Sequence, residues 1–161
     1  MGQTDSVSDL IQSVVGRGCL QLLLFIASNG LLLADNWPNF RGPNFDGSNT
    51  SRNMPVYISK TDHLSWQTDL TGNGSSTPAV WDKSIFVTAT GKEGHGVWGS
   101  RIDLYTGKMI WTHELDQIER HDRRSDLAGP SPTTDGEVVI FLTGGGKLSA
   151  YDFDGELKWE K

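Results

Sequence analysis

The first cluster of chemically capable residues is His121, Asp122, Arg123 and Arg124, inside the stretch 116–129. A histidine beside a carboxylate can titrate near neutral pH, and two neighbouring arginines can clamp an anionic ligand. A solvated, purely structural loop has the same composition. The sequence therefore predicts an anion-binding loop here, with a solvent-facing charge cluster as the alternative.

A second candidate is the glycine-bordered stretch 91–99, which carries His95 and Trp98 and is expected to be a loop. Functional residues of β-rich folds concentrate in such loops. Aspartates elsewhere stand beside turn glycines, where a carboxylate usually accepts from nearby backbone N–H groups. Because no D-x-D-x-D-G spacing occurs, no calcium loop is predicted, and neither a catalytic residue nor a metal ligand is assigned.

Composition limits the function classes. The chain has 161 residues, 36% hydrophobic and 21% charged, with a net charge of −6. Residues 35–161 hold 18 acidic and 13 basic side chains, which argues against a nucleic-acid partner. Cys19 is the sole cysteine, so residues 35–161 cannot form a disulfide.

The N-terminal part is expected to direct export. Residues 20–34 contain eight leucines and isoleucines and no charge, too short for a typical membrane span but suited to a signal peptide. Residues 1–34 are therefore predicted to be a signal peptide or an uncleaved signal anchor, with a buried helix as the alternative. The acidic stretch before the segment is atypical, and a start at Val14 or Val15 would remove it. The expected location is periplasmic or extracellular, with membrane contact only through an uncleaved signal.

After residue 34 the pattern predicts short β-strands and no helix. Strands rich in β-branched and aromatic residues are expected at 84–90 and 137–143. Shorter strands are expected at 101–104, 108–114, 147–152 and 156–160, each bounded by glycine or aspartate turns.

A repeat is visible when the turns are aligned. Thr77-Pro78 recurs as Ser131-Pro132 after 54 residues, and Gly107 and Trp111 recur as Gly155 and Trp159 after 48 residues. Trp66 precedes Trp111 by 45 residues, so these tryptophans are expected to pack in the core. Four short strands per roughly 45 residues indicate blades of a β-propeller, with a β-sandwich as the alternative.

The repeat resembles the tryptophan-docking motif D-x-x-T-G-K-x-x-W of the pyrroloquinoline-quinone-like (PQQ-type) propeller repeats, in the quinoprotein alcohol dehydrogenase-like superfamily. The matching residues are Asp103, Thr106, Gly107, Trp111 and, in a form one turn residue shorter, Asp152, Gly155 and Trp159. The resemblance implies that the Asp and Thr brace a turn and that the Trp packs onto the adjoining blade. Arg101 stands where the family usually has a small residue, as at Ala150, and is expected to weaken one blade contact.

Residues 36–47 are similar to the W-P-x-[WF]-R-G-P-x-x-D-G opening of secreted superfamily members that are abundant in planctomycete-type bacteria. Pro130 to Gly136 resembles their S-P-x-x-D-G blade start. Trp37 and Arg41 are expected to fix the opening segment against a blade. The expected organisation is a signal segment at 1–34, an opening segment at 35–63 and propeller repeats at 64–161.

The expected fold is all-β, a partial β-propeller with two to three four-stranded antiparallel blades of a ring of about seven or eight. The chain is accordingly expected to be the N-terminal part of a longer propeller. Other blades of a longer chain, or self-association, would cover its open edge.

Three functions stay open at this stage. The leading one is a non-catalytic exported module that binds or scaffolds a protein or a polymer, as resemblance to outer-membrane-assembly repeat proteins implies. The second is part of a quinoprotein dehydrogenase that oxidises an alcohol, which alone would bring pyrroloquinoline quinone and calcium as cofactors. The third is a truncated product without autonomous function. The repeat by itself implies fold ancestry and no cofactor.

Overall fold

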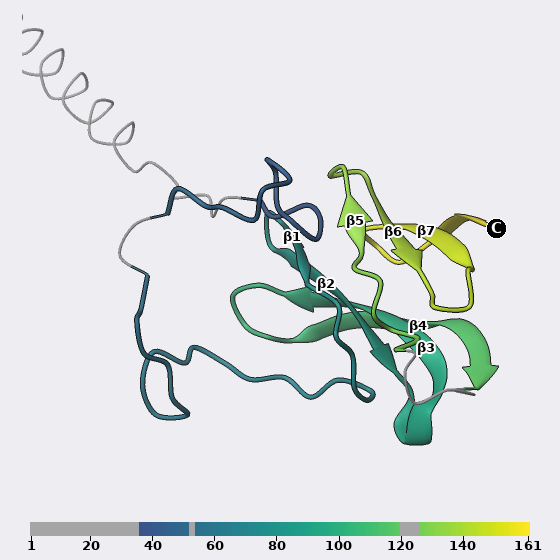
Figure 1. Ribbon diagram of the computed structural model, residues 1–161, viewed down its shortest axis with the longest axis horizontal. Coiled ribbons are helices and arrows are strands. Elements are labelled where there is room, and N and C mark those ends of the chain that lie inside the picture. The colour runs from purple at the N-terminus through teal and green to yellow at the C-terminus, as the bar shows by residue number, and fades with distance from the viewer. Residues whose placement is uncertain (1–35, 52–53, 120–125) are drawn as a thin grey trace, which may run out of the picture. The chain divides into compact units, whose positions relative to one another are not determined.

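The computed structural model describes residues 36–51, 54–119 and 126–161. The predicted signal segment and the cluster 121–124 lie outside the described residues. Within these ranges the regular structure consists of eight β-strands and one short 3-10 helix, Lys92–Gly94 (Figure 1). The all-β fold expected from the sequence is therefore confirmed.

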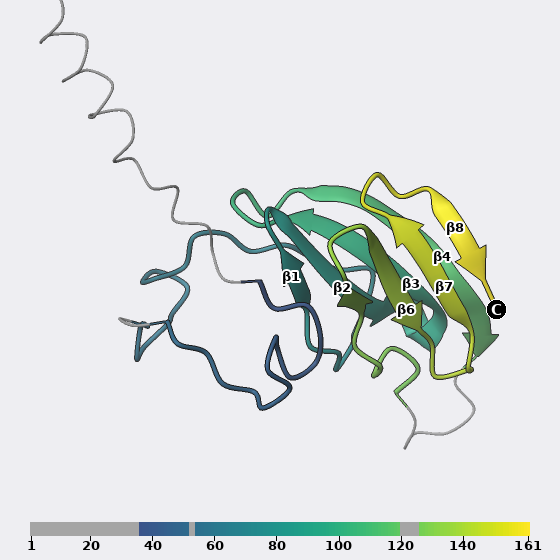
Figure 2. The ribbon, with the colours of Figure 1, turned by 90° about the horizontal axis from the view of Figure 1, so that it is seen from above.

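The strands form two antiparallel four-stranded sheets, each a simple meander in chain order. The first sheet contains β1 (Ala79–Trp81), β2 (Ser84–Thr90), β3 (His95–Asp103) and β4 (Met109–Glu119). The second contains β5 (Thr133–Thr134), β6 (Val138–Leu142), β7 (Leu148–Asp152) and β8 (Leu157–Glu160). Figure 2 shows β8 at the outer edge of the second sheet.

The strand pattern reflects how each segment is buried. Ser84–Thr90 is a strand at the predicted bounds. Most of its side chains on both faces are buried, and its sequence is therefore a continuous run of apolar and β-branched residues without the alternation of polar and apolar residues that a half-exposed strand shows. The strands near 101 and 108 are longer than expected: β3 begins at His95, and β4 continues to Glu119. Strands β1 and β5 were not predicted because they have only three and two residues.

The two sheets share an irregularity at the same place. Arg101 of β3 lies opposite Trp111 of β4, and Ala150 of β7 lies opposite Trp159 of β8. In both pairs the register shifts immediately after the third-strand residue, as in a β-bulge. A bulge bends the strand and increases its twist, so it re-aims the side chains beside it. The repeat seen in the sequence is thus a repeat of backbone geometry as well.

The hydrophobic core contains side chains of both sheets. Its fully buried members include Phe86 from β2, Leu115 from β4 and Phe141 from β6. The Phe86 ring meets Phe153 edge-on at 4.9 Å between centroids, which joins the first sheet to the β7–β8 turn. Burial of such aromatic side chains is the main stabilising contribution available to this fold.

Polar contacts also cross between the two repeats. The buried Thr88 hydroxyl donates to the carbonyl oxygens of Ala128 and Pro130, at 3.0 and 3.2 Å. The Thr77 N–H donates to the Ser131 hydroxyl at 2.9 Å, so two positions that correspond in the sequence repeat contact each other. The sheets are therefore joined by specific hydrogen bonds in addition to apolar packing.

The opening segment is held by backbone hydrogen bonds to both sheets. Trp37 exchanges two N–H···O bonds of 2.8 Å with Val80 of β1, and the Thr134 N–H of β5 donates to the Pro38 carbonyl at 2.9 Å. Trp37 thus fixes the segment against a sheet, as predicted. Arg41 does not: its guanidinium donates to the Asp46 carbonyl within the segment's own loop, because that loop turns back on itself.

Candidate functional site

The most elaborate polar structure among the described residues is the turn between β3 and β4, built around one aspartate. A single carboxylate oxygen of Asp103 accepts from the N–H groups of Tyr105 and Thr106, at 3.1 and 2.8 Å, and from the Thr106 hydroxyl at 2.7 Å. The Gly107 N–H donates to the Asp103 carbonyl at 2.9 Å. The Asp and Thr therefore brace this turn, as the resemblance implied.

These hydrogen bonds favour the ionised carboxylate. The Thr106 hydroxyl, followed by the Thr106 N–H, lowers the pKa of Asp103 below its usual value. Asp135, in the turn before β6, shows the same effect, since the N–H groups of Val138 and Glu137 lower its pKa. The turn aspartates are therefore structural anions, and in each of them one carboxylate oxygen accepts hydrogen bonds from its own turn.

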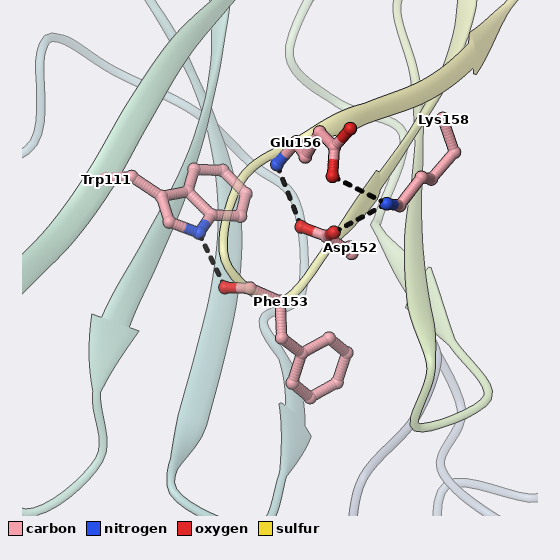
Figure 3. Close-up of polar contacts among 5 residues, drawn as sticks. All are labelled: Trp111, Asp152, Phe153, Glu156 and Lys158. Atoms are coloured by element: carbon pink, nitrogen blue, oxygen red, sulfur yellow. Dashed lines mark hydrogen bonds and ion pairs between the residues drawn. The ribbon is translucent and has the colours of Figure 1, made fainter.

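The corresponding turn of the second sheet keeps the aspartate but replaces the threonine (Figure 3). Asp152 accepts from the Glu156 N–H and from the Lys158 ammonium, both at 2.8 Å. Lys158 also contacts Glu156 at 2.9 Å. The Lys158 contact is the largest cause of the lowered Asp152 pKa, and the pKa of Lys158 is raised in return. An ion pair thus takes the place of the hydroxyl in the shortened turn.

Trp111 of the first sheet docks on this second turn. Its indole N–H donates to the Phe153 carbonyl at 2.9 Å (Figure 3), and its ring lies 5.9 Å from Tyr151 and 6.3 Å from Phe141. Phe153 is the residue directly after the turn aspartate Asp152. The tryptophan therefore packs onto the adjoining sheet and donates to a fixed backbone position of its turn.

The same arrangement occurs one repeat earlier. The Trp66 indole N–H donates at 2.9 Å to the carbonyl of Leu104, the residue directly after Asp103. The Thr68 hydroxyl adds a second hydrogen bond, to the Gly107 carbonyl. Residues 64–69, which carry Trp66, form no strand. Trp66 therefore docks on the β3–β4 turn of the first sheet in the same way as Trp111 of β4 docks on the β7–β8 turn of the second sheet. The difference is that Trp66 belongs to a segment outside the sheets.

The turn glycines make room for the docked rings. A Cβ atom on Gly107 would lie 2.5 Å from Trp66 ring carbons, and one on Gly155 would lie 3.0 Å from Cδ1 of Trp111. Both glycines also have a positive φ, which side-chain-bearing residues adopt at a cost. Glycine is therefore required at this position by the turn and by the neighbouring indole.

Arg101 strengthens the contact that it was expected to weaken. Its Nε donates to the Ser84 hydroxyl at 3.0 Å, and its Nη1 donates to the Phe153 carbonyl at 2.5 Å. The guanidinium carbon lies 5.7 Å from the centroid of the Phe153 ring. That prediction was wrong because the long side chain reaches out of its own sheet and adds a second donor beside Trp111.

His113 lies in the same contact zone between the sheets. Its ring stacks on Trp111 at 5.0 Å and on Tyr151 at 5.0 Å, with an interplanar angle of 9° to the tyrosine. Within the described ranges, its buried Nε2 has no hydrogen-bond partner. Burial raises the pKa of the Tyr151 phenol. Sequence reasoning did not single out His113, because nothing local marks a histidine that packs on the side chains of a distant strand.

The predicted ligand-binding residues fall in different places. His121, Asp122, Arg123 and Arg124 lie outside the described residues, so their prediction is untested. His95 and Trp98 are described, but in strand β3 and not in a loop: His95 faces Glu119, and Trp98 faces Ala89 and Glu114. Residues 91–99 include the turn of a hairpin, because β3 (95–103) pairs antiparallel with β2.

Trp98 is half-buried against its own hairpin. A Cβ on Gly91 would lie 3.0 Å from the Trp98 indole nitrogen. His95 is exposed at the beginning of β3. The ligand-binding role predicted for these two residues stays a prediction.

A small cavity lies within the opening segment, with a volume of about 330 Å³. It is lined by Asn36, Pro43, Asn44, Ser48, Asn49 and Thr50, whose polar groups are uncharged amides and hydroxyls. Within the described residues no three His, Cys, Asp or Glu side chains gather to hold a metal ion. No helix in the described part of the chain is long and apolar enough to cross a membrane.

Part of this chain is similar in sequence to known proteins. A family model described as outer membrane protein assembly factor BamB matches residues 50–161. The outer membrane protein assembly factor BamB of Xanthomonas campestris pv. campestris is 35% identical over 85 residues, which are 51% of this chain and 20% of that protein. The chain thus spans about a fifth of the length of this curated relative.

Two solved structures are similar over part of their length. The quinohemoprotein alcohol dehydrogenase ADHIIG from Pseudomonas putida HK5 is 26% identical over 52% of this chain and 12% of its own, with a TM-score of 0.38. BamB from Moraxella catarrhalis is 16% identical over 60% of this chain and 41% of its own, with a TM-score of 0.29.

The family match covers both sheets and both braced turns. The two four-stranded antiparallel sheets are blades of a β-propeller, which confirms the fold class expected from the repeat. The chain therefore belongs to the PQQ-like repeat β-propeller family that is described as outer membrane protein assembly factor BamB.

Proposed function

We propose that this chain is an exported, non-catalytic β-propeller module that binds another protein during the assembly of outer membrane proteins. The observation that carries the proposal is the family match over residues 50–161, since both that family and the Xanthomonas relative are described as outer membrane protein assembly factors. Fold membership alone does not define function, so the binding surface has to be argued from this chain's own residues.

One segment of the chain has the properties of a protein contact. Val56, Tyr57 and Ile58 are consecutive, apolar and more than half exposed, and Met54 beside them is exposed as well. The segment belongs to no strand, so it also presents backbone donors and acceptors. Contiguous exposed apolar surface on a folded protein often marks an interaction site. We assign residues 54–58 as the partner-binding segment.

The charge of the chain supports a protein partner over a nucleic acid. Its net charge of −6 opposes binding to a phosphate backbone. An extended apolar segment suits a partner that offers a hydrophobic groove or a free sheet edge. A polysaccharide or another polymer is the alternative partner. Binding of such a polymer is expected to depend on polar residues and much less on the apolar segment 54–58.

The experiment is a deletion of the gene in its host, followed by measurement of the folded fraction of outer-membrane β-barrel proteins from their heat-dependent gel mobility. We expect the folded fraction to fall and to be restored by the wild-type gene. Rescue by Tyr57→Asp is expected to fail, because a charge there disfavours an apolar contact. An unchanged folded fraction after deletion would contradict the assembly role.

Matched controls separate binding from folding and export. Lys60→Asp places the same acidic side chain, with a larger change in charge, on an exposed position of the neighbouring turn and is expected to rescue fully. Tyr57→Asp must retain the wild-type melting temperature, since the Tyr57 side chain is mostly exposed. Fractionation of host cells checks export, and recovery of the native protein from the cytosol would overturn that part of the proposal.

A further inference from the structure

The small cavity within the opening segment is lined by residues that carry no ionisable side chain. Its lining consists of three asparagines, a serine, a threonine and a proline, namely Asn36, Asn44, Asn49, Ser48, Thr50 and Pro43. Small-molecule sites in proteins begin at about 300 Å³, and the volume of this cavity, about 330 Å³, lies just above that limit. The cavity is therefore suited in size and in charge to a small neutral ligand.

Two of the asparagine amides in the lining have their oxygen atoms fixed by the backbone. The Asn36 Oδ1 accepts from the Asp82 N–H at 2.8 Å, and the Asn49 Oδ1 accepts from the Ser51 N–H. Among the described residues, no hydrogen bond uses the side-chain NH₂ group of Asn36, Asn44 or Asn49. Because a bound oxygen fixes the plane of an amide, the NH₂ groups of Asn36 and Asn49 are oriented donors that the fold itself does not use.

The loop that carries most of the lining is closed by its own hydrogen bonds. The Gly47 N–H donates to the Arg41 carbonyl at 2.9 Å. The N–H and the hydroxyl of Ser48 both donate to one carboxylate oxygen of Asp46 at 2.8 Å. The wall of the cavity is therefore built by the loop alone, and a ligand that enters it has little chain left to order.

Phe45, the neighbour of the lining residue Asn44, has a conformation that packing in the core does not explain. Its φ is 58°, in the left-handed region, which is an outlier for a bulky residue. Its side chain is 70% exposed, so burial of the ring does not compensate for this backbone. Backbone strain of this kind concentrates at ligand-binding sites. An exposed ring beside amide donors also offers the mixture of apolar and polar contacts that such sites use.

We propose that this cavity binds one ring of a neutral sugar. The sugar oxygens accept from the asparagine NH₂ groups, the hydroxyls of Ser48 and Thr50 exchange hydrogen bonds with those of the ligand, and its C–H face packs on Pro43. An anion fits less well, because no basic side chain lines the cavity and the net charge of the chain is −6. The inference goes beyond the proposed protein contact and does not depend on it, since residues 54–58 do not line the cavity.

The test titrates the isotope-labelled full chain with the trisaccharide of N-acetylglucosamine and, separately, with maltotriose, and follows the side-chain amide signals by NMR. The two sugars differ in the acetamido group, so the comparison identifies which kind of neutral sugar the site takes. At least one of them is expected to shift the NH₂ signals of Asn36, Asn44 and Asn49 in a saturable manner. The expected Kd is about 1 mM, because so small a contact gains little binding free energy. Inorganic phosphate is expected to leave these signals unchanged.

Three variants connect the binding to the cavity. Asn44→Ala removes a side chain that makes no hydrogen bond within the described residues, and it is expected to raise the Kd about fivefold, as for the loss of one hydrogen bond. Asn36→Asp keeps the acceptor for the Asp82 N–H but removes the NH₂ donor, and it is expected to weaken binding at least as much. The matched control is Asn73→Ala, which removes an exposed amide outside the cavity and should bind like the wild type. Circular dichroism verifies that each variant is folded.

The proposal is overturned if neither sugar shifts the asparagine signals, or if phosphate shifts them as strongly as the sugars do. Unchanged binding by folded Asn44→Ala would overturn it as well. The same holds for equal weakening by Asn73→Ala, since the effect would then not come from the cavity. None of these results bears on the outer-membrane assembly role, which the deletion experiment tests separately.

Discussion

Arg101 and Trp111 face each other across β3 and β4, and both donate a hydrogen bond to one acceptor, the Phe153 carbonyl of the adjoining blade. One backbone oxygen thus satisfies two donors that come from neighbouring strands. Because a carbonyl has two lone pairs, it can accept both. The blade interface is therefore fixed in direction as well as held by apolar contact.

Removing the docking indole is expected to destabilise the chain strongly. Trp111→Ala should lower the free energy of unfolding by about 3 kcal/mol, since a large, partly buried aromatic side chain is lost from the core. Trp111→Phe should cost less, about 1 kcal/mol for the hydrogen bond plus some packing. Urea denaturation measures both. Equal losses for the two variants would mean that ring volume contributes nothing at this site.

Two glycines offer a matched pair for testing the indole contact. Gly155 and Gly146 have the same φ of 91°, but a Cβ on Gly155 would meet Trp111 and His113, whereas one on Gly146 would meet nothing within 4 Å. Gly146→Ala should cost only the backbone strain, about 1–2 kcal/mol. Gly155→Ala should cost clearly more in the same denaturation experiment. Equal losses of unfolding free energy in the two variants would show that the Trp111 ring moves aside for the added methyl group without a measurable penalty.

The braced turn predicts a pH dependence. The pKa of Asp103 is lowered in the folded chain, so its contribution to stability is present above the usual value of 3.8 and is lost as the pH falls through the lower folded value. Asp103→Asn should therefore be less stable than the wild type at pH 6, with the difference shrinking toward pH 3. A difference that stays constant with pH would contradict the assignment.

The hydroxyl of Thr88 gives a test of the polar contact between repeats. Thr88→Val keeps the shape but removes the donor, which leaves the carbonyls of Ala128 and Pro130 without it. The expected loss is about 1–3 kcal/mol of unfolding free energy, as for other buried groups deprived of a partner. Thr133→Val, at an exposed position of β5, is the control and should change little. A neutral result at Thr88 would mean that water replaces the hydroxyl.

The local turn chemistry could be predicted from the sequence, whereas the partners across the interface could not. Asp103 and Thr106 are three residues apart, so residue type and spacing suffice to predict their hydrogen bond. The acceptors of the docked indoles are backbone carbonyls of Leu104 and Phe153, and any residue type provides a carbonyl. Nothing in the sequence pattern therefore marks them.

Other features depended on packing between distant elements. The sequence predicts that Arg101 weakens a contact between blades, because its hydrogen bond to the Phe153 carbonyl of the next blade cannot be inferred from its own strand. The hairpin at 91–99 was predicted as a loop because its glycines resemble loop residues. The prediction for 121–124 and that for the signal segment at 1–34 lie outside the described residues and stay untested.

The backbone bonds of the opening segment have a consequence for the order of folding. Trp37 pairs with Val80, 43 residues later in the sequence, and Pro38 accepts from Thr134, 96 residues later. Contacts between residues so far apart in sequence close large loops, and the entropy lost on closure favours their formation after the local hairpins. The opening segment would then form its contacts after the folding transition state. A substitution that weakens these contacts is expected to accelerate unfolding and to leave the refolding rate nearly unchanged.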